Sequence, residues 1–247
     1  MIPKRLHYVW VGGPMPDTYR ANIYGWRRVH PDWDVVAWNE SNIDLSHPLL
    51  VEAYRNRKWA KVADIARLVA VREQGGVYLD TDFAVLRPLD PLLRHRCFFA
   101  FQGSEKASDL VANGCFGAEP GHWFIREALE TVLRMRTVPF NLDRPTRYGP
   151  KLITRLLRSH GLAAEGPEGA TVRDIKICPT PVFFPYSYGG TYTPDCVRDC
   201  TLAVHQWGAS WKRPKPWPVR AIQFAGKRLE GALRPRKALQ QWPQNPV

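Results

Sequence analysis

The chain has 247 residues, 45% of them hydrophobic, which is enough apolar mass for a domain with a buried core. No run of about 18 apolar residues occurs, so the sequence predicts no transmembrane helix. The first residues also lack the apolar stretch of a signal peptide. Five cysteines, an odd number, fit reduced thiols better than a disulfide framework. We therefore expect a cytoplasmic protein.

The formal net charge of +12 is unevenly distributed. Residues 212–247 carry nine Lys or Arg and one acid, Glu230. Two interpretations of this basic tail stay open: peripheral contact with the anionic inner face of the cytoplasmic membrane, or a solvated tail. Nucleic acid is disfavoured as a partner, because no recognition motif accompanies the charge.

The first predicted elements form a strand, a helix and a strand. Residues 6–11 are apolar and β-rich and end at a Gly-Gly-Pro turn. A helix is expected over residues 18–29, before Pro31, and a second strand over residues 33–38. This order within about 35 residues is typical of a parallel βαβ unit.

The clearest predicted helix spans residues 59–74, where apolar side chains recur at helical spacing. Gly75 and Gly76 end it, since glycine readily adopts the left-handed conformation of a helix C-cap. Residues 77–79 then form a short strand that places Asp80 and Asp82 at its end. The chain continues near Val85 as strand or turn.

Further strands are expected over residues 97–101, 111–118, 171–177 and 201–206, and further helices over 123–135 and 150–159. Prolines after Trp211 end the regular pattern, although one short helix is expected over residues 221–233. We predict one α/β domain with a mostly parallel central sheet, residues 1–211, followed by the tail, residues 212–247. Cys196 and Cys200 have no second ligand pair for zinc, so we interpret them as structural and buried.

Asp80 and Asp82 are the first candidates for chemistry. On an extended chain, residues two apart point the same way, so both carboxylates can converge on one hard cation. Two adjacent acids repel unless a positive charge lies between them, and Mg²⁺ or Mn²⁺ bound to a diphosphate supplies that charge. Taken alone, the D-x-D pattern is weak, because a solvated acidic turn also produces it.

The preceding helix strengthens the pattern. Asp64 and Arg67 lie three residues apart and share a helix face that leads to the Gly-Gly end and the acidic pair. A surface ion pair would contribute only ~0–1 kcal/mol. Small apolar residues surround this pair in the sequence, however, which favours a buried floor of a site.

Three motifs in order resemble the family 32 glycosyltransferases, the sugar-binding-region enzymes to which clostridial glucosylating toxins are distantly similar. The first is I-P-K-R-L-H-Y-V-W-V-G-G at residues 2–13. The second is A-D-I-A-R at residues 63–67 with G-G-V-Y-L-D-T-D at residues 75–82. The third is H-Q-W-G-A-S-W at residues 205–211. Together they span most of the chain.

This resemblance implies a GT-A fold, an α/β sandwich with a Rossmann-like half, and sugar transfer with retention of configuration. It implies that Trp10 stacks on the nucleotide base and that the backbone around Val9 and Val11 contacts the base edge. It assigns the donor's ribose and sugar hydroxyls to Asp64 and Arg67. The donor-binding set that it predicts is Val9, Trp10, Asp64, Arg67, Tyr78, Asp80, Ser210 and Trp211.

The same resemblance assigns the metal to Asp82 and His205, with Asp80 contacting the donor directly or through metal-bound water. Neutral imidazole is a good Mn²⁺ ligand, and Ser210 and the Trp211 indole are donors suited to diphosphate oxygens. Asn113, in N-G-C-F-G-A at residues 113–118, resembles a segment that faces the sugar. The predicted catalytic set is Asp80, Asp82 and Asn113.

Two positions depart from the family pattern: Ala63 stands where an alcohol is usual, and Tyr148 precedes Gly149-Pro150 where threonine is usual. Neither departure touches the predicted metal ligands. Arg147 is a further candidate for the diphosphate, on charge alone.

We therefore predict a retaining glycosyltransferase that depends on Mn²⁺ or Mg²⁺ and uses a UDP- or GDP-linked sugar. The expected acceptor is a saccharide or lipid-linked oligosaccharide, as in surface polysaccharide synthesis. Two alternatives stay open: a nucleotide-sugar or carbohydrate-binding protein without turnover, and an aspartate-based phosphohydrolase. The second is disfavoured because Ala84 stands where such enzymes usually have Thr or Val.

Overall fold

The computed structural model describes residues 1–103, 110–135 and 149–208. Contacts divide the chain into one compact unit, Met1–Trp207, and a second, Gly208–Val247, of which only Gly208 is described. The predicted tail, with its expected helix over residues 221–233, lies outside the described residues, and the predicted boundary after residue 211 stays a prediction. None of the helices in the described ranges is long and apolar enough to cross a membrane.

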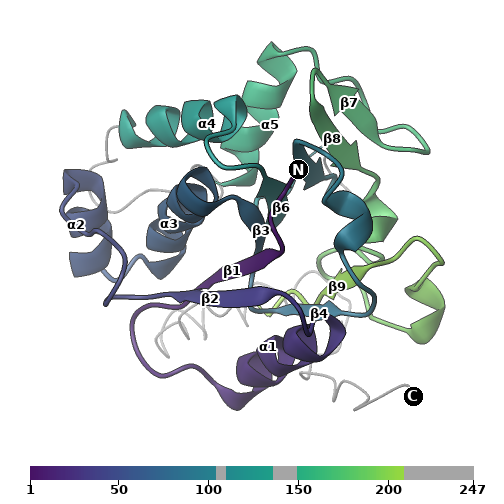
Figure 1. Ribbon diagram of the computed structural model, residues 1–247, viewed down its shortest axis with the longest axis horizontal. Coiled ribbons are helices and arrows are strands. Elements are labelled where there is room, and N and C mark those ends of the chain that lie inside the picture. The colour runs from purple at the N-terminus through teal and green to yellow at the C-terminus, as the bar shows by residue number, and fades with distance from the viewer. Residues whose placement is uncertain (104–109, 136–148, 209–247) are drawn as a thin grey trace, which may run out of the picture. The chain divides into compact units, whose positions relative to one another are not determined.

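The first unit combines helices and strands (Figure 1). Their bounds in chain order are β1 (Arg5–Val9), α1 (Asp17–Val29), β2 (Asp34–Trp38), α2 (Pro48–Arg55), α3 (Trp59–Gln74), β3 (Gly76–Leu79), β4 (Phe83–Val85), β5 (Cys97–Ala100), β6 (Cys115–Ala118), α4 (Trp123–Leu133), α5 (Pro150–Ser159), β7 (Ala170–Val172), β8 (Ile175–Cys178) and β9 (Ala203–His205).

The central sheet of the described residues has seven strands in the order β2-β1-β3-β6-β5-β8-β7. Strands β2, β1 and β3 pair in parallel, and so do β5 and β8. Strand β6 is antiparallel to both of its neighbours, and β7 is antiparallel to β8. Five of these seven strands therefore run in one direction, which confirms the predicted α/β class with a mostly parallel sheet.

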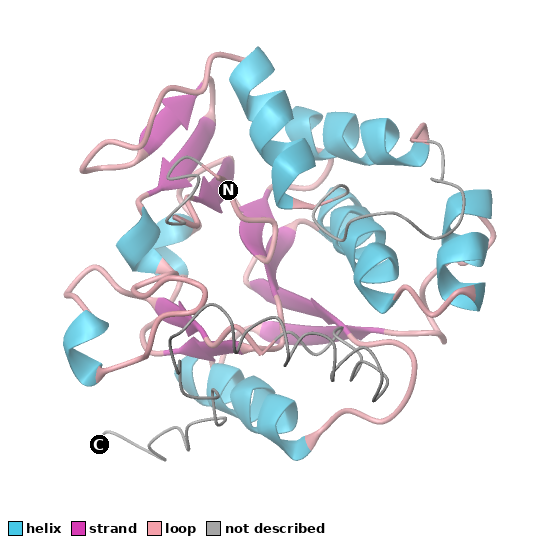
Figure 2. Cartoon of the chain, turned by 180° about the vertical axis from the view of Figure 1, so that it is seen from behind, coloured by secondary structure: helices cyan, strands magenta, loops and turns pink. Residues whose placement is uncertain are grey.

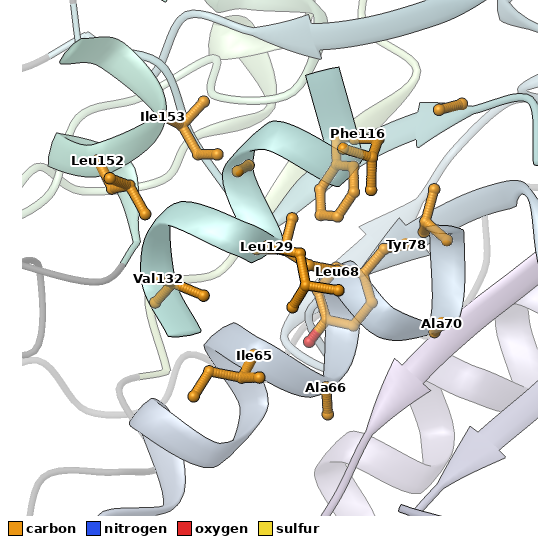
Figure 3. Close-up of a cluster of buried hydrophobic side chains, with 14 of the residues drawn as sticks. Ile65, Ala66, Leu68, Ala70, Tyr78, Phe116, Leu129, Val132, Leu152 and Ile153 are labelled. Atoms are coloured by element: carbon orange, nitrogen blue, oxygen red, sulfur yellow. The ribbon is translucent and has the colours of Figure 1, made fainter. Parts of the chain in front are cut away.

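Two hydrophobic cores lie on the two faces of this sheet, because successive strand residues point to opposite sides. Tyr78 belongs to the core with α2, α3, α4 and α5 (Figure 3), whereas its neighbours Val77 and Leu79 belong to the other. The second core includes Ile23 and Trp26 of α1. Figures 1 and 2 show α1 separated from the other helices, beside the two-stranded ladder of β4 and β9.

His7 is a buried polar side chain within β1 and ties this strand to its surroundings. Its Nδ1 accepts a hydrogen bond from the Trp38 indole at 3.0 Å, which leaves Nε2 to donate to the Gly75 carbonyl at 2.7 Å. The bond that Nδ1 accepts requires the neutral ring, because a protonated Nδ1 can only donate. Burial, the largest effect, lowers the pKa of His7 to about 4.

Helix α3 has the predicted bounds, and its C-cap Gly75 has φ +62°. A Cβ at this position would lie 2.6 Å from Pro120, so glycine is required for space as well as conformation. The helix ends here, and the chain passes directly into β3, the strand that carries the predicted site.

Two predicted strands differ markedly from the structure, and one helix was not predicted. The strand expected over residues 171–177 is the hairpin of β7 and β8, which turns at Arg173 with φ +56°. The strand expected over 111–118 begins only at Cys115, because Val111 forms a single bridge to Phe101. Helix α2 was not predicted; His47 accepts a hydrogen bond from the Leu49 N–H and caps its start.

Candidate active site

The candidate site lies at one edge of the central sheet. Strands β1 and β3 end there, and β6, which is antiparallel to β3, begins there. Asp80 directly follows β3, and its N–H donates to the carbonyl of Gly114, the residue before β6, at 2.8 Å. Trp10 follows β1 at the same edge. The strand order thus gathers residues from three separate parts of the sequence.

Arg67 of α3 connects these residues beneath the sheet edge. Its Nη1 donates to the Asn113 carbonyl at 2.7 Å, and its Nη2 lies 3.1 Å from Asp80 Oδ1 and 3.4 Å from Asp64 Oδ1. The Asn113 amide donates to Asp64 Oδ1 at 2.7 Å. Asp64 and Arg67 are 6% and 5% exposed, which confirms that the pair is buried and not a solvated ion pair.

Burial is the largest effect on the pKa values of the two carboxyl groups that Arg67 contacts, Asp64 and Asp80. It raises the pKa of Asp64 to about 6, although Arg67 and the Asn113 hydrogen bond act in the opposite direction. Burial also raises the pKa of Asp80; Arg67 opposes this shift and the Asp82 carboxylate adds to it. The pKa of Arg67 is raised, because the surrounding acidic groups outweigh the effect of its burial. The site therefore holds more acidic charge than its one arginine balances.

Asp80, Thr81 and Asp82 form a turn, with the Phe83 N–H donating to the Asp80 carbonyl at 3.1 Å. The expected extended geometry at these residues was wrong. The carboxylates of Asp80 and Asp82 still approach each other. The turn leads into β4, which pairs with β9 and sets Phe83 opposite His205, so the histidine reaches the same place. His205 Nε2 lies 3.2 Å from Asp82 Oδ1.

Asp80, Asp82 and His205 offer ligand atoms that all lie within 4.8 Å of one another. An octahedral Mg²⁺ or a similar ion, with bonds of about 2.1 Å, has ligand atoms roughly 3–4 Å apart, so small side-chain movements would complete this geometry. Two carboxylates and an imidazole suit Mn²⁺, and the carboxylates suit Mg²⁺. His205 Nδ1 is buried and has no hydrogen-bond partner among the described residues. These residues fit a divalent ion.

Glycines at two positions let the backbone approach the site closely. A Cβ on Gly114 would lie 2.5 Å from Asp80 Oδ2, and one on Gly149 would lie 2.7 Å from Asn113 Nδ2. Real Cβ atoms essentially never come so close. Gly114 and Gly149 therefore help to set the positions of Asp80 and Asn113, and we had not predicted this role for either glycine.

The other described residues of the predicted donor-binding set differ in their surroundings. Trp10 is partly buried; its indole N–H donates to the Gly13 carbonyl at 2.9 Å, and its ring lies 5.3 Å from that of Tyr19. The side chains of Val9 and Val11 are buried in the core. The Tyr78 hydroxyl donates to Asp80 Oδ1 at 2.8 Å, so it holds a candidate ligand in place.

Some predicted residues lie outside the described part of the chain: Arg147, Tyr148, Ser210 and Trp211. The five cysteines are unpaired. Cys196 is partly buried and Cys200 is exposed, so the expectation that both are buried was wrong. Cys196 ends the short helical turn Pro194–Cys196, and Cys200 lies in a turn that follows it.

Sequence analysis also missed Asn22 and Gln206, which contact the acidic turn. Asn22 is one of several polar residues on α1 and gives no recognisable signal in one sequence. Gln206 lies inside the H-Q-W motif, so its position beside His205 could have indicated it.

Comparison with known proteins bears on the resemblance to a glycosyltransferase family. Residues 16–99 match the family model described as "Glycosyltransferase sugar-binding region containing DXD motif". Asp64, Arg67, Asp80 and Asp82 lie inside this range, whereas His205 and the N-terminal motif lie outside it. The match confirms the resemblance inferred from the motifs.

Two similar proteins are named for mannosyl transfer or for the synthesis of a mannosylated ceramide. Mannosyl phosphorylinositol ceramide synthase SUR1 of Saccharomyces cerevisiae is 29% identical over 53% of this chain and 35% of its own length. Inositol phosphoceramide mannosyltransferase 1 of Schizosaccharomyces pombe is 26% identical over 60% of this chain and 46% of its own length. The chain thus spans less than half the length of these two proteins.

Among solved structures, the PaToxG glycosyltransferase superposes with a TM-score of 0.51 over 64% of this chain and 69% of its own length, at 14% identity. At this identity the likeness shows the fold alone, which is the predicted GT-A fold. Residues 16–99, which carry the acidic turn and the buried Asp64–Arg67 pair, are thus similar to the glycosyltransferase sugar-binding region containing a DXD motif.

Proposed function

We propose that this protein transfers a sugar from a nucleotide-diphospho-sugar to a saccharide or glycolipid acceptor, in a reaction that depends on a divalent ion. The observation that carries the proposal is the convergence of Asp80, Asp82 and His205 beside the buried Asp64–Arg67–Asn113 network. This arrangement supplies ligands for an ion and polar groups for a sugar at one edge of the sheet.

The three ligand residues would hold Mn²⁺ or Mg²⁺, which supplies positive charge that stabilises a diphosphate as it leaves the sugar. Asp64 Oδ1 already accepts from Asn113 and lies 3.4 Å from Arg67. A carboxylate fixed in this way is suited to accept hydrogen bonds from sugar hydroxyls in one orientation. Trp10, at the end of β1, would stack on the nucleotide base.

We further propose that the reaction retains the anomeric configuration by front-face attack. The acceptor hydroxyl oxygen bonds to the anomeric carbon, the bond from that carbon to the phosphate oxygen breaks, and the departing phosphate takes the hydroxyl proton. Asp64 is held by Arg67 and Asn113, and Asp80 by Arg67 and Tyr78. These contacts fit carboxylates that bind and position better than carboxylates that form a covalent sugar intermediate.

The acceptor is proposed from chemistry that relatives share. Two relatives are named for mannosyl transfer to inositol phosphoceramide, and a human relative is an alpha-1,4-N-acetylglucosaminyltransferase, 30% identical over 56% of this chain. A sugar carried on a lipid fits this set, with GDP-mannose and UDP-sugars as candidate donors. The basic tail would favour peripheral binding to the anionic inner face of the cytoplasmic membrane.

The proposal is tested by offering UDP- and GDP-sugars to the purified full chain and measuring release of the nucleoside diphosphate with Mn²⁺, with Mg²⁺ and with EDTA. We expect release from one donor class, dependent on the ion. Metal-dependent nucleotide binding without any hydrolysis or transfer would favour a binding protein. Phosphate release from a generic phosphoester would favour a phosphohydrolase and refute the proposal.

A further inference from the structure

Each residue of the acidic turn is held through its backbone by a different part of the fold. The Asp80 N–H donates to the Gly114 carbonyl at 2.8 Å. The Thr81 carbonyl accepts from the Asn22 side-chain amide at 2.9 Å. The Asp82 carbonyl accepts from the Gln206 N–H at 2.8 Å. The positions of the two carboxylates thus depend on α1 and on the residue after β9 as well as on the central sheet.

Asn22 and Gln206 also bind each other through their side-chain amides. Asn22 Nδ2 donates to Gln206 Oε1 at 3.0 Å, and Gln206 Nε2 lies 3.5 Å from Asn22 Oδ1. Both side chains are partly buried, which limits competition from water. The pair joins positions 184 residues apart in the sequence. One asparagine therefore connects the turn that carries Asp82 to the residue that follows His205.

Helix α1 places Asn22 rigidly. Ile23 and Trp26 of the same helix are buried, and the Trp26 indole donates to the Phe83 carbonyl at 2.8 Å. Phe83 begins β4, directly after Asp82. The helix is therefore fixed to this segment at two points, one on each side of Asp82, and the amide of Asn22 has little freedom to move away.

The ladder that brings His205 to Asp82 is short. Strands β4 and β9 pair over three residues each, from Phe83 opposite His205 to Val85 opposite Ala203. Isolated two-stranded pairs are at best marginally stable in water. The amide pair lies at the end of this ladder where the ligands are, so it is well placed to keep that end closed.

We propose that Asn22 and Gln206 are positioning residues that hold Asp82 and His205 at the separation needed to share one divalent ion. The inference rests on the proposed function, since it assigns a partner to the same ion site. Neither residue is proposed to touch the ion or the donor. Their role is to fix the distance between a ligand in the turn and a ligand on β9.

The experiment measures Mn²⁺ binding to the full chain by electron paramagnetic resonance, in which free Mn²⁺ is counted directly, together with the thermal unfolding temperature. The variants are Asn22→Ala, Gln206→Ala and the double exchange Asn22→Gln with Gln206→Asn, which conserves the summed length of the two side chains. Tyr24→Ala is the matched control, because Tyr24 lies on the same helix and is 67% exposed.

We expect each alanine variant to weaken Mn²⁺ binding by roughly 10- to 100-fold, the usual cost of removing a group that orients a metal ligand. The double exchange should recover most of this loss, because an amide pair can form again. Tyr24→Ala should bind as the wild type does. A purely structural role would instead lower the unfolding temperature and leave the Mn²⁺ affinity of the folded protein unchanged.

The outcomes separate the two proposals. If the wild type binds Mn²⁺ and both alanine variants bind it equally well, the positioning role is refuted while the proposed function stands. The same conclusion follows if Tyr24→Ala loses as much affinity as Asn22→Ala. If the wild type itself binds no Mn²⁺, the proposed metal dependence fails, and the positioning role fails with it.

Discussion

Replacing Gly114 with alanine tests the geometry of the acidic turn with a single methyl group. The new Cβ would lie 2.5 Å from Asp80 Oδ2, whereas ordinary contacts begin at 3.4 Å. Gly114 does not have a positive φ, so alanine can adopt its backbone conformation. The substitution therefore acts mainly by pushing the carboxylate of Asp80.

The required movement can be estimated from these distances. Oδ2 must retreat by about 0.9 Å, the difference between 2.5 and 3.4 Å. The other oxygen of Asp80 is held by the Tyr78 hydroxyl and by Arg67 at 2.8 and 3.1 Å, so the whole side chain cannot simply shift. A displacement near 1 Å at a reacting site costs about 100-fold in rate, which is about 2.7 kcal/mol.

The assay compares kcat/KM for donor hydrolysis and the Kd for Mn²⁺ in the wild type, Gly114→Ala and Gly25→Ala. Gly25 lies in α1, and a Cβ there would meet nothing within 4 Å, so Gly25→Ala should keep wild-type activity. Because alanine favours helix over glycine, this control should also gain about 0.5–1 kcal/mol of stability. A Gly114→Ala enzyme with unchanged kcat/KM and Mn²⁺ affinity would show that Asp80 Oδ2 is not held where its function requires it.

Three further predictions follow from the buried charges. The free energy of unfolding should fall by about 3 kcal/mol as pH drops from about 6.5 to 4. The reason is that the folded-state pKa of His7 is lowered to about 4, so the unfolded chain takes up the proton first. Urea unfolding at several pH values should show that a His7→Gln chain lacks this component. Arg67→Met should lower the free energy of unfolding by about 3–5 kcal/mol, since it leaves the buried Asp64 and the partly exposed Asp80 without their cation. An Arg67→Lys protein with wild-type stability would contradict the need for the several N–H donors of arginine. Asp82→Ala should lower donor turnover by on the order of 10³-fold, because ion stabilisation of the leaving group contributes several kcal/mol. The control Cys200→Ser, at an exposed thiol, should have no effect. Equal mild losses in the two variants would count against the ion site.

The sequence predicted the elements whose signals are local. The bounds of α3 followed from the spacing of its apolar residues and from Gly75, and α5 followed in the same way from Pro150 to Ser159. The hairpin of β7 and β8 was missed because Arg173 turns with a positive φ that its residue type does not indicate. Helix α2, with eight residues, was too short to show a clear period.

Site residues that lie in family motifs were predicted from the sequence. Site residues whose role depends on tertiary contacts were missed. Asp64, Arg67 and Asp80 were named from the motifs, and the structure brings them together. The positions of Asn22 and Gly114 depend on which elements pack together, which a single sequence does not display. The turn at residues 80–82 was expected to be extended, because a periodic pattern cannot show a hydrogen bond such as that from Phe83 to Asp80.

The separation in sequence between Asp82 and His205 has a consequence during synthesis of the chain. Ribosomes add about 5–20 residues per second, so the histidine follows the aspartate by roughly 6–25 s. Strands β1, β3 and β6 and helix α3 are complete well before that moment. Arg67 and its acidic partners Asp64 and Asp80 are therefore synthesised before the last ligand exists, so the guanidinium is the counter-charge available to them before all three ligands can bind an ion.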